Sequence, residues 1–177
     1  MDDIANSRPS ALKKAVEAVD WISKIAGYIG APLPFICAFI IVYEIIMRTW
    51  FERPTPWVAE TTAMLCAACY FLGGAWNVKI DGHIRVDVLY SKFPPRVKAG
   101  FSCLNFGFMA LYVGFMLRVI WPYMRQSIEL NESTYTFWNP IIWPLKILMF
   151  VGFALILLQG FANFLRDAHF LATGREL

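Results

Sequence analysis

Charged residues are scarce in this chain of 177 residues. Asp, Glu, Lys and Arg make up 16% of it, against about 25% in an ordinary soluble domain, while hydrophobic residues make up 58%. The scarcity is uneven, because four long stretches contain almost no charge. A water-soluble four-helix bundle needs a polar face along each helix, so these stretches exclude that class of fold.

Histidine is nearly absent too. The chain has only His83 and His169, and both lie outside the four apolar stretches. Haem held between two histidines in a membrane, or a metal site built on paired histidines, is therefore not expected. The four cysteines fall inside the stretches, where we interpret them as packing residues. The chain also lacks a Gly-rich phosphate loop and a nucleophile motif, so we expect neither an enzyme nor a cofactor.

The four stretches are long enough to cross a lipid bilayer. About 20 apolar residues in a helix span a hydrocarbon core of roughly 30 Å, because a helix rises about 1.5 Å per residue. We predict an all-α membrane protein with one integral membrane domain, residues 1–177, and four spans at about 25–46, 57–78, 99–121 and 143–165. The N-terminus lacks the pattern of a cleavable signal peptide, so the first span is expected to remain as an anchor.

Lys and Arg are divided unequally between the two sides of these spans. The two terminal segments and the central connection carry eleven of them, and the other two connections with their adjoining span ends carry five. The positive-inside rule then predicts that both termini and the central connection are cytoplasmic. The net charge of +3 is attributed to this topology, and no nucleic-acid partner is expected.

Residues 10–24 have the spacing of an amphipathic helix. Four charged residues recur at intervals of four, three and four: Lys13, Glu17, Asp20 and Lys24. We predict a helix on the membrane surface that enters the first span directly, with a solvated cytoplasmic helix as the alternative. Pro32 and Pro34 are expected to bend or interrupt the first turns of that span.

Small residues recur in the third span. Gly100, Gly107 and Gly114 follow one another at intervals of seven, which places them on one face of a helix. Glycines so spaced let another helix approach closely in lipid, so we predict a helix-packing surface.

The central connection carries His83, Arg85 and Asp87 at alternate positions. A short surface helix is predicted at residues 87–93, where Asp87 can cap its start and Pro94-Pro95 ends it. Taken alone, the three residues are typical of a solvated loop that carries topogenic charge. An Arg and an Asp two apart on an extended segment nevertheless point the same way and can bond to a neighbouring loop.

Three further charges lie near the opposite side of the membrane. Glu44 precedes Arg48 by four residues, a spacing that favours an ion pair, and Glu60 lies where a helix N-terminus favours negative charge. We interpret them as residues of the membrane rim rather than as a transport site, and as candidates for binding a partner subunit.

Together these features resemble the small membrane (Q-type) subunit of tripartite ATP-independent periplasmic (TRAP) transporters. The matching elements are Arg48 at the end of the first span, the WVAE motif of Trp57–Glu60, the HIRVD motif of His83–Asp87, Pro94-Pro95, and the aromatic and proline run of Trp138–Pro144, which contains Pro140. The likeness covers nearly the whole chain.

The resemblance implies an accessory subunit that is not an enzyme. It would brace a large sodium-coupled membrane subunit during secondary active uptake of an organic acid that a periplasmic binding protein delivers. Its expected partners are that large subunit, the binding protein and membrane lipid. In the bacterial inner membrane that the resemblance implies, we expect His83, Arg85 and Asp87 to lock the cytoplasmic loop. Four residues are expected to dock the outer rim onto the large subunit or the binding protein: Glu44, Arg48, Trp57 and Glu60. Pro140 is expected to belong to the partner interface or to a structural motif. The alternative is a haem- or quinone-linked membrane anchor subunit of a redox complex.

Overall fold

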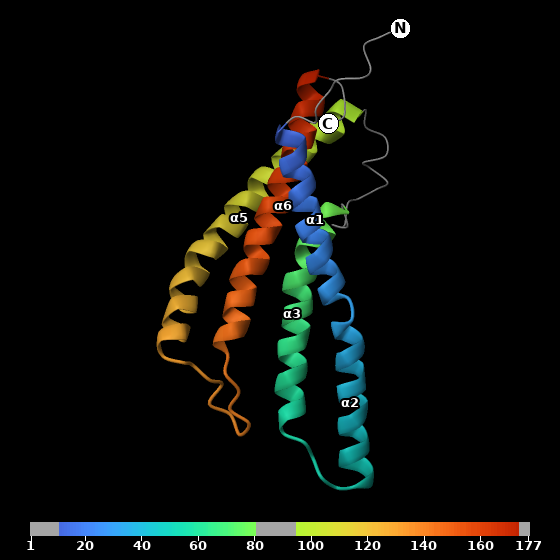
Figure 1. The fold of residues 1–177 in the computed structure, drawn as a ribbon, viewed down its shortest axis with the longest axis vertical. Coiled ribbons are helices and arrows are strands. Elements are labelled where there is room, and N and C mark those ends of the chain that lie inside the picture. The colour runs from blue at the N-terminus through green and yellow to red at the C-terminus, as the bar shows by residue number, and fades with distance from the viewer. Residues whose placement is uncertain (1–10, 81–94, 174–177) are drawn as a thin grey trace.

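The computed structural model describes residues 11–80 and 95–173, and five helices lie within them (Figure 1). They are α1 (Ala11–Gly30), α2 (Leu33–Trp50), α3 (Trp57–Lys79), α5 (Pro95–Glu129) and α6 (Trp143–Thr173). Four segments are long and apolar enough to cross a membrane: Lys13–Trp50, Trp57–Lys79, Gly100–Glu129 and Trp143–Leu171. The predicted all-α class with four spans is confirmed.

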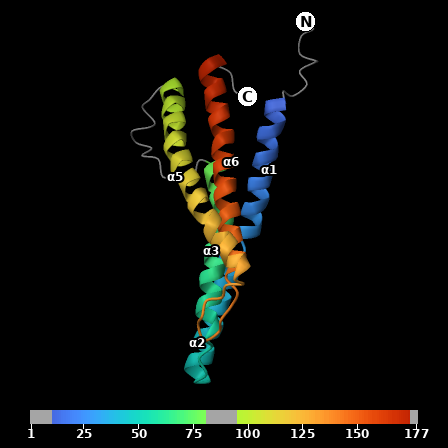
Figure 2. The same ribbon diagram turned by 90° about the vertical axis from the view of Figure 1, so that its left-hand side faces the viewer.

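The helices stand in a row rather than around a common axis. α5 packs on α6, α6 on α3 and α3 on α2, while α1 lies against α3 and α6 (Figure 1). Seen from the side, α2 lies behind α3 in the lower part of the molecule (Figure 2). Within the described residues, this arrangement leaves much of both broad faces uncovered, and large apolar side chains such as Phe39 and Tyr70 are more than three-quarters exposed. Lipid tails are as apolar as these side chains, so a membrane accommodates the arrangement.

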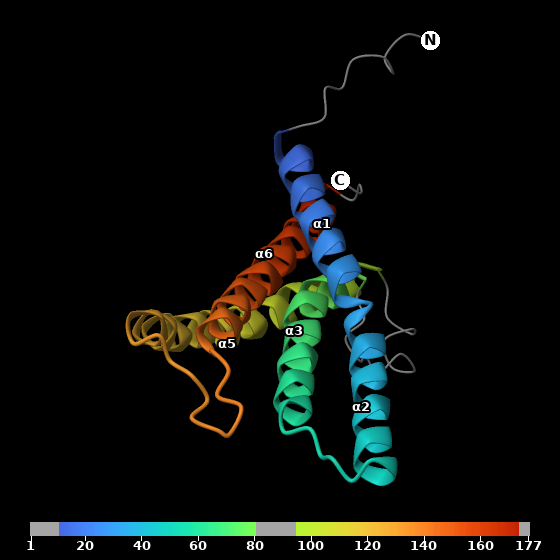
Figure 3. The ribbon, with the colours of Figure 1, turned by 60° about the horizontal axis from the view of Figure 1, so that its bottom comes forward.

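The first predicted span is divided between α1 and α2. Ala31 and Pro32 form the turn between them, because a proline has no N–H to continue the helical hydrogen bonds. Figure 3 shows the resulting change of direction. The interruption expected from Pro32 and Pro34 is therefore confirmed. α1 extends past the predicted residues 10–24 as far as Gly30; its location on the membrane surface stays a prediction.

Glycine and aromatic residues set the spacing of α6 from its neighbours. The backbone of α3 passes so close to Gly152 that a Cβ there would lie 2.9 Å from the carbonyl oxygen of Phe71. On the other side, the rings of Trp121 and Phe150 are 5.4 Å apart, and those of Phe106 and Phe164 are 4.9 Å apart. α6 is thus packed closely on both sides, between α5 and α3.

The glycine face of α5 makes no contact of the expected kind within this chain. A Cβ built on Gly100, Gly107 or Gly114 would meet nothing within 4 Å in the part of the chain that the structure describes. The predicted packing surface therefore has none of the helices α1, α2, α3 or α6 against it.

Replacing Gly152 by Ala is expected to destabilise the protein by roughly 1–3 kcal/mol, because the new methyl group collides with backbone atoms of α3 that cannot rotate away. Thermal unfolding in detergent, followed by size-exclusion fluorescence, measures the effect. The matched control is Gly73→Ala, where the space around the added Cβ is open. Equal melting temperatures for the two variants would contradict the close α3–α6 contact.

Candidate functional site

The residues predicted to lock the central connection, His83, Arg85 and Asp87, lie outside the described residues, as does the predicted helix at 87–93. The described part of the chain instead concentrates its polar contacts in two places. We call these the upper polar cluster, at the top of α3 in Figure 1, and the lower polar cluster, beside the connection between α5 and α6.

The upper polar cluster is centred on the carboxylate of Asp20 in α1. Arg166 of α6 places its Nη2 atom 2.6 Å from Asp20 Oδ2, and Gln159 Nε2 donates to Asp20 Oδ1 at 2.8 Å. Lys79, at the end of α3, donates from Nζ to the backbone oxygen of Asp20 at 3.2 Å. One acidic residue therefore joins three helices.

Asn163 completes the upper polar cluster. Its Nδ2 atom donates to the carbonyl oxygen of Val78 at 2.9 Å, and its Oδ1 atom accepts from Arg166 Nη1 at 3.3 Å. Val78 belongs to the last turn of α3, where backbone carbonyls have no helical partner. Gln159, beside it, is completely buried. The cluster thus gives hydrogen-bond partners to most of these polar groups, while the Oε1 atom of Gln159 has none among the described residues.

Sequence analysis missed this cluster as a unit. The sequence places Asp20 in the predicted surface helix. Lys79 and Arg166 are counted there only among the eleven Lys and Arg residues that predict the membrane orientation. A signal was present in α6, where Gln159, Asn163 and Arg166 follow one another at helical intervals and so share a face. Their partner Asp20 is too distant in sequence for spacing to identify it.

Near the end of α2, the carboxylate of Glu44 accepts hydrogen bonds from two residues. Arg48 contacts its Oε1 atom through Nη2 at 2.7 Å and Nε at 3.1 Å, so the pair that the spacing favours is present. The other oxygen, Oε2, accepts from the backbone N–H of Thr55 at 3.0 Å, which fastens the connection between α2 and α3. The side chain of Glu44 is 12% exposed, and that of Arg48 is 68% exposed. Arg48 therefore presents its charge outward.

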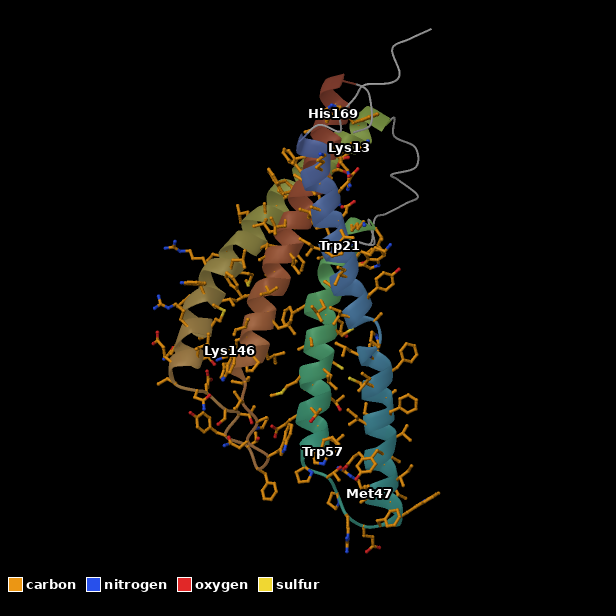
Figure 4. The ribbon with its side chains drawn as sticks, in the orientation of Figure 1. Lys13, Trp21, Met47, Trp57, Lys146 and His169 are labelled. Atoms are coloured by element: carbon orange, nitrogen blue, oxygen red, sulfur yellow. The ribbon has the colours of Figure 1, made fainter. Side chains whose placement is uncertain are left out.

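Trp57 and the pair of Glu44 with Arg48 belong to the same region of the structure. The rings of Trp57 and Tyr43 lie 6.1 Å apart between the lower ends of α3 and α2 (Figure 4). Next to them, Glu44, Arg48 and Thr55 line a groove of about 540 Å³ between the two helices.

The lower polar cluster joins Glu60 and Pro140, which sequence analysis named separately. Thr134 Oγ1 donates to Glu60 Oε2 at 3.1 Å, and the Thr134 backbone N–H donates to the carbonyl oxygen of Pro140 at 3.0 Å. Lys146, near the lower end of α6 in Figure 4, forms an ion pair with Glu132. The connection 130–142 is thereby fastened to both α3 and α6.

Charge pairing changes the acidity of Glu132. The Lys146 ammonium group donates to its carboxylate and holds the pKa of Glu132 below the ordinary value for a glutamate. Among the described residues, no group of three His, Cys, Asp or Glu side chains could hold a metal ion.

Comparison with known proteins gives one family. The sequence matches the family model described as "Tripartite ATP-independent periplasmic transporters, DctQ component" over residues 37–170. No curated protein matches the chain. The matched region contains the outer rim, the lower polar cluster and the α3 and α6 residues of the upper polar cluster, but not Asp20.

A double-mutant cycle should separate the Asp20–Arg166 pair from an ordinary surface pair. We expect a coupling free energy of about 1.5–3 kcal/mol between Asp20→Ala and Arg166→Ala, because hydrogen bonds to a charged, partly buried group are strong. The control pair Arg125 and Glu129 is about two-thirds exposed at both residues and should give about 0.3–0.5 kcal/mol. Unfolding in detergent measures both. Equal couplings would contradict a role for Asp20 as the joint of three helices.

Acid should loosen the connection 130–142. A lowered pKa in the folded state means that Glu132 stabilises the fold above the ordinary glutamate pKa, and that this contribution is lost as pH falls through the lowered value. The amide exchange rate of residues 130–142, corrected for its intrinsic pH dependence, should therefore rise as pH falls from the ordinary glutamate pKa through the lowered value. Glu132→Gln should remove the step, so identical pH profiles for the variant and the wild type would exclude this role for Glu132.

Proposed function

The chain belongs to the family of DctQ components of tripartite ATP-independent periplasmic transporters, and we propose that it braces the large membrane subunit of such a transporter. In this proposal the complex carries out sodium-coupled, secondary active uptake of an organic acid that a periplasmic binding protein delivers. The family is one of transporter components, not of enzymes. The match favours this function over a haem- or quinone-linked anchor of a redox complex.

The observation that carries the bracing role is the fastening of the helix row at both ends. The upper polar cluster joins α1, α3 and α6, and the lower polar cluster joins α3, α6 and the connection between α5 and α6. Between the clusters the contacts are close and apolar. Helices tied at two levels resist sliding past each other, which suits a part that stays fixed while its partner moves.

We propose that the upper polar cluster faces the cytoplasm and the rim faces the periplasm. The excess of Lys and Arg on the terminal segments and the central connection supports this orientation. Glu44 then orients Arg48, whose exposed guanidinium group is suited to an acidic group on the binding protein or the large subunit. Trp57, Glu60 and Pro140 shape the same rim, and His83, Arg85 and Asp87 hold the cytoplasmic connection.

Reconstitution tests the proposal. Proteoliposomes that contain this chain and its large subunit should take up an organic acid when given binding protein and an inward sodium gradient. Omitting this chain should lower the initial rate by about tenfold or more, because the moving subunit loses its fixed support. Liposomes with this chain alone should accumulate nothing.

Two results would overturn the proposal: uptake by this chain alone, or undiminished uptake by the large subunit without it. Arg85→Ala and Asp87→Ala belong in the same assay. Both should lower uptake or the yield of complex, and wild-type values for both would remove the role assigned to the cytoplasmic connection.

A further inference from the structure

One face of α5 combines an isolated positive charge with an uncovered apolar surface. Gly107, Leu111, Gly114 and Arg118 lie at helical intervals of four, three and four, so they form one stripe. Leu111 is 75% exposed and Arg118 is also exposed. The opposite side of the helix contains Val113 and Ile120, which are buried toward α6. The stripe therefore points away from the rest of the chain.

Arg118 lies well inside the apolar part of the structure. It precedes Trp121 by about one turn, Trp121 packs on Phe150, and Phe150 follows Lys146 by about one turn. Arg118 is thus about two turns, or about 10 Å, deeper than the Lys146 ion pair.

A second set of contacts gives the same depth. The ring contacts of α5 with α6 place Arg118 near the level of Gly152, which packs on Phe71. Phe71 stands about midway along α3 between Glu60 and Lys79. Both sets of contacts place the charge at the depth of the lipid tails.

Arg118 has no hydrogen-bond or ion-pair partner within residues 11–80 and 95–173. Charged side chains in lipid normally face a protein partner or reach toward the membrane surface. Arg118 lies about 10 Å from the level of the Lys146 ion pair on one side and, at the level of Phe71, about as far from the level of Lys79 on the other. Neither membrane surface is therefore close to its guanidinium group.

We infer that this stripe of α5 receives a membrane helix of the large subunit that carries an aspartate or glutamate at the depth of Arg118. The inference rests on the proposed function, which supplies the large subunit. The two glycines allow the backbones to approach, and the carboxylate neutralises the guanidinium group away from water. A second copy of this chain fits poorly, because a symmetric contact through the stripe would bring two Arg118 side chains together.

Site-specific photocrosslinking tests the assignment in native membranes. Leu111→p-benzoylphenylalanine, in the full chain co-expressed with its large subunit, should give an adduct with a large-subunit helix that contains Asp or Glu. Phe39→p-benzoylphenylalanine is the control, since Phe39 is equally exposed, at 76%, on α2. Adducts with lipid only, adducts between two copies of this chain, or equal large-subunit yields at both positions would overturn the assignment.

Charge reversal tests the role of Arg118 itself. Arg118→Glu should lower the recovery of large subunit with the purified chain by about tenfold or more, because it sets two negative charges against each other in lipid. Arg118→Lys should retain most of it. Arg125→Glu, near the level of Lys146, should change recovery by less than about twofold, because Arg125 is exposed beside Glu129.

A compensating change in the large subunit tests the pair directly. If replacing the Asp or Glu of the crosslinked helix by Arg restores recovery of the large subunit with Arg118→Glu, the pair is established. Wild-type recovery of Arg118→Glu would refute it. If the wild-type chain binds the large subunit and supports uptake while Leu111 gives only lipid adducts, the inference fails and the proposed function stands. If the wild-type chain does not bind the large subunit, both fail.

Discussion

The ion pair between Asp20 and Arg166 lies where α1, α3 and α6 meet. The Asp20 side chain is only 18% exposed, so its carboxylate takes most of its hydrogen-bond donors from the protein. Asp20 finds them on α3 and α6, so satisfying one side chain fixes the position of three helices. The remaining donors and acceptors of Asn163 and Val78 follow from that arrangement. The hydrogen bonds of one carboxylate therefore help to set how α1, α3 and α6 pack in a mostly apolar chain.

The row of helices is suited to the lipid that surrounds the spans. In water, so much exposed apolar surface would drive the helices into a compact bundle. In lipid that driving force is absent, and helices associate through close packing and polar contacts. Gly152 against Phe71 supplies the close packing, and the two polar clusters supply the contacts at either end. An open row with two free faces is the outcome, and such a shape is suited to standing beside a larger membrane protein.

The rim illustrates how one residue can have an internal and an external role. Glu44 is almost fully used inside the chain, since it bonds both Arg48 and the backbone of Thr55. Its contribution to a partner surface is therefore indirect, through the orientation that it gives to the exposed Arg48. Glu60 is likewise committed to Thr134. The residues chosen from sequence as a docking set thus act partly as supports for the residues that remain free.

The helical class, the four spans and the break at Pro32 could be predicted from the amino-acid sequence, because each follows from local composition and from the backbone chemistry of proline. So could the pairing of Glu44 with Arg48, since four residues on a helix bring two side chains together. Three features became visible from the fold alone: Asp20 meets Arg166, Thr134 links Glu60 to Pro140, and no described residue packs closely on the glycine face of α5. These features depend on which helices become neighbours, and a periodic pattern specifies a face of a helix without specifying what lies against it.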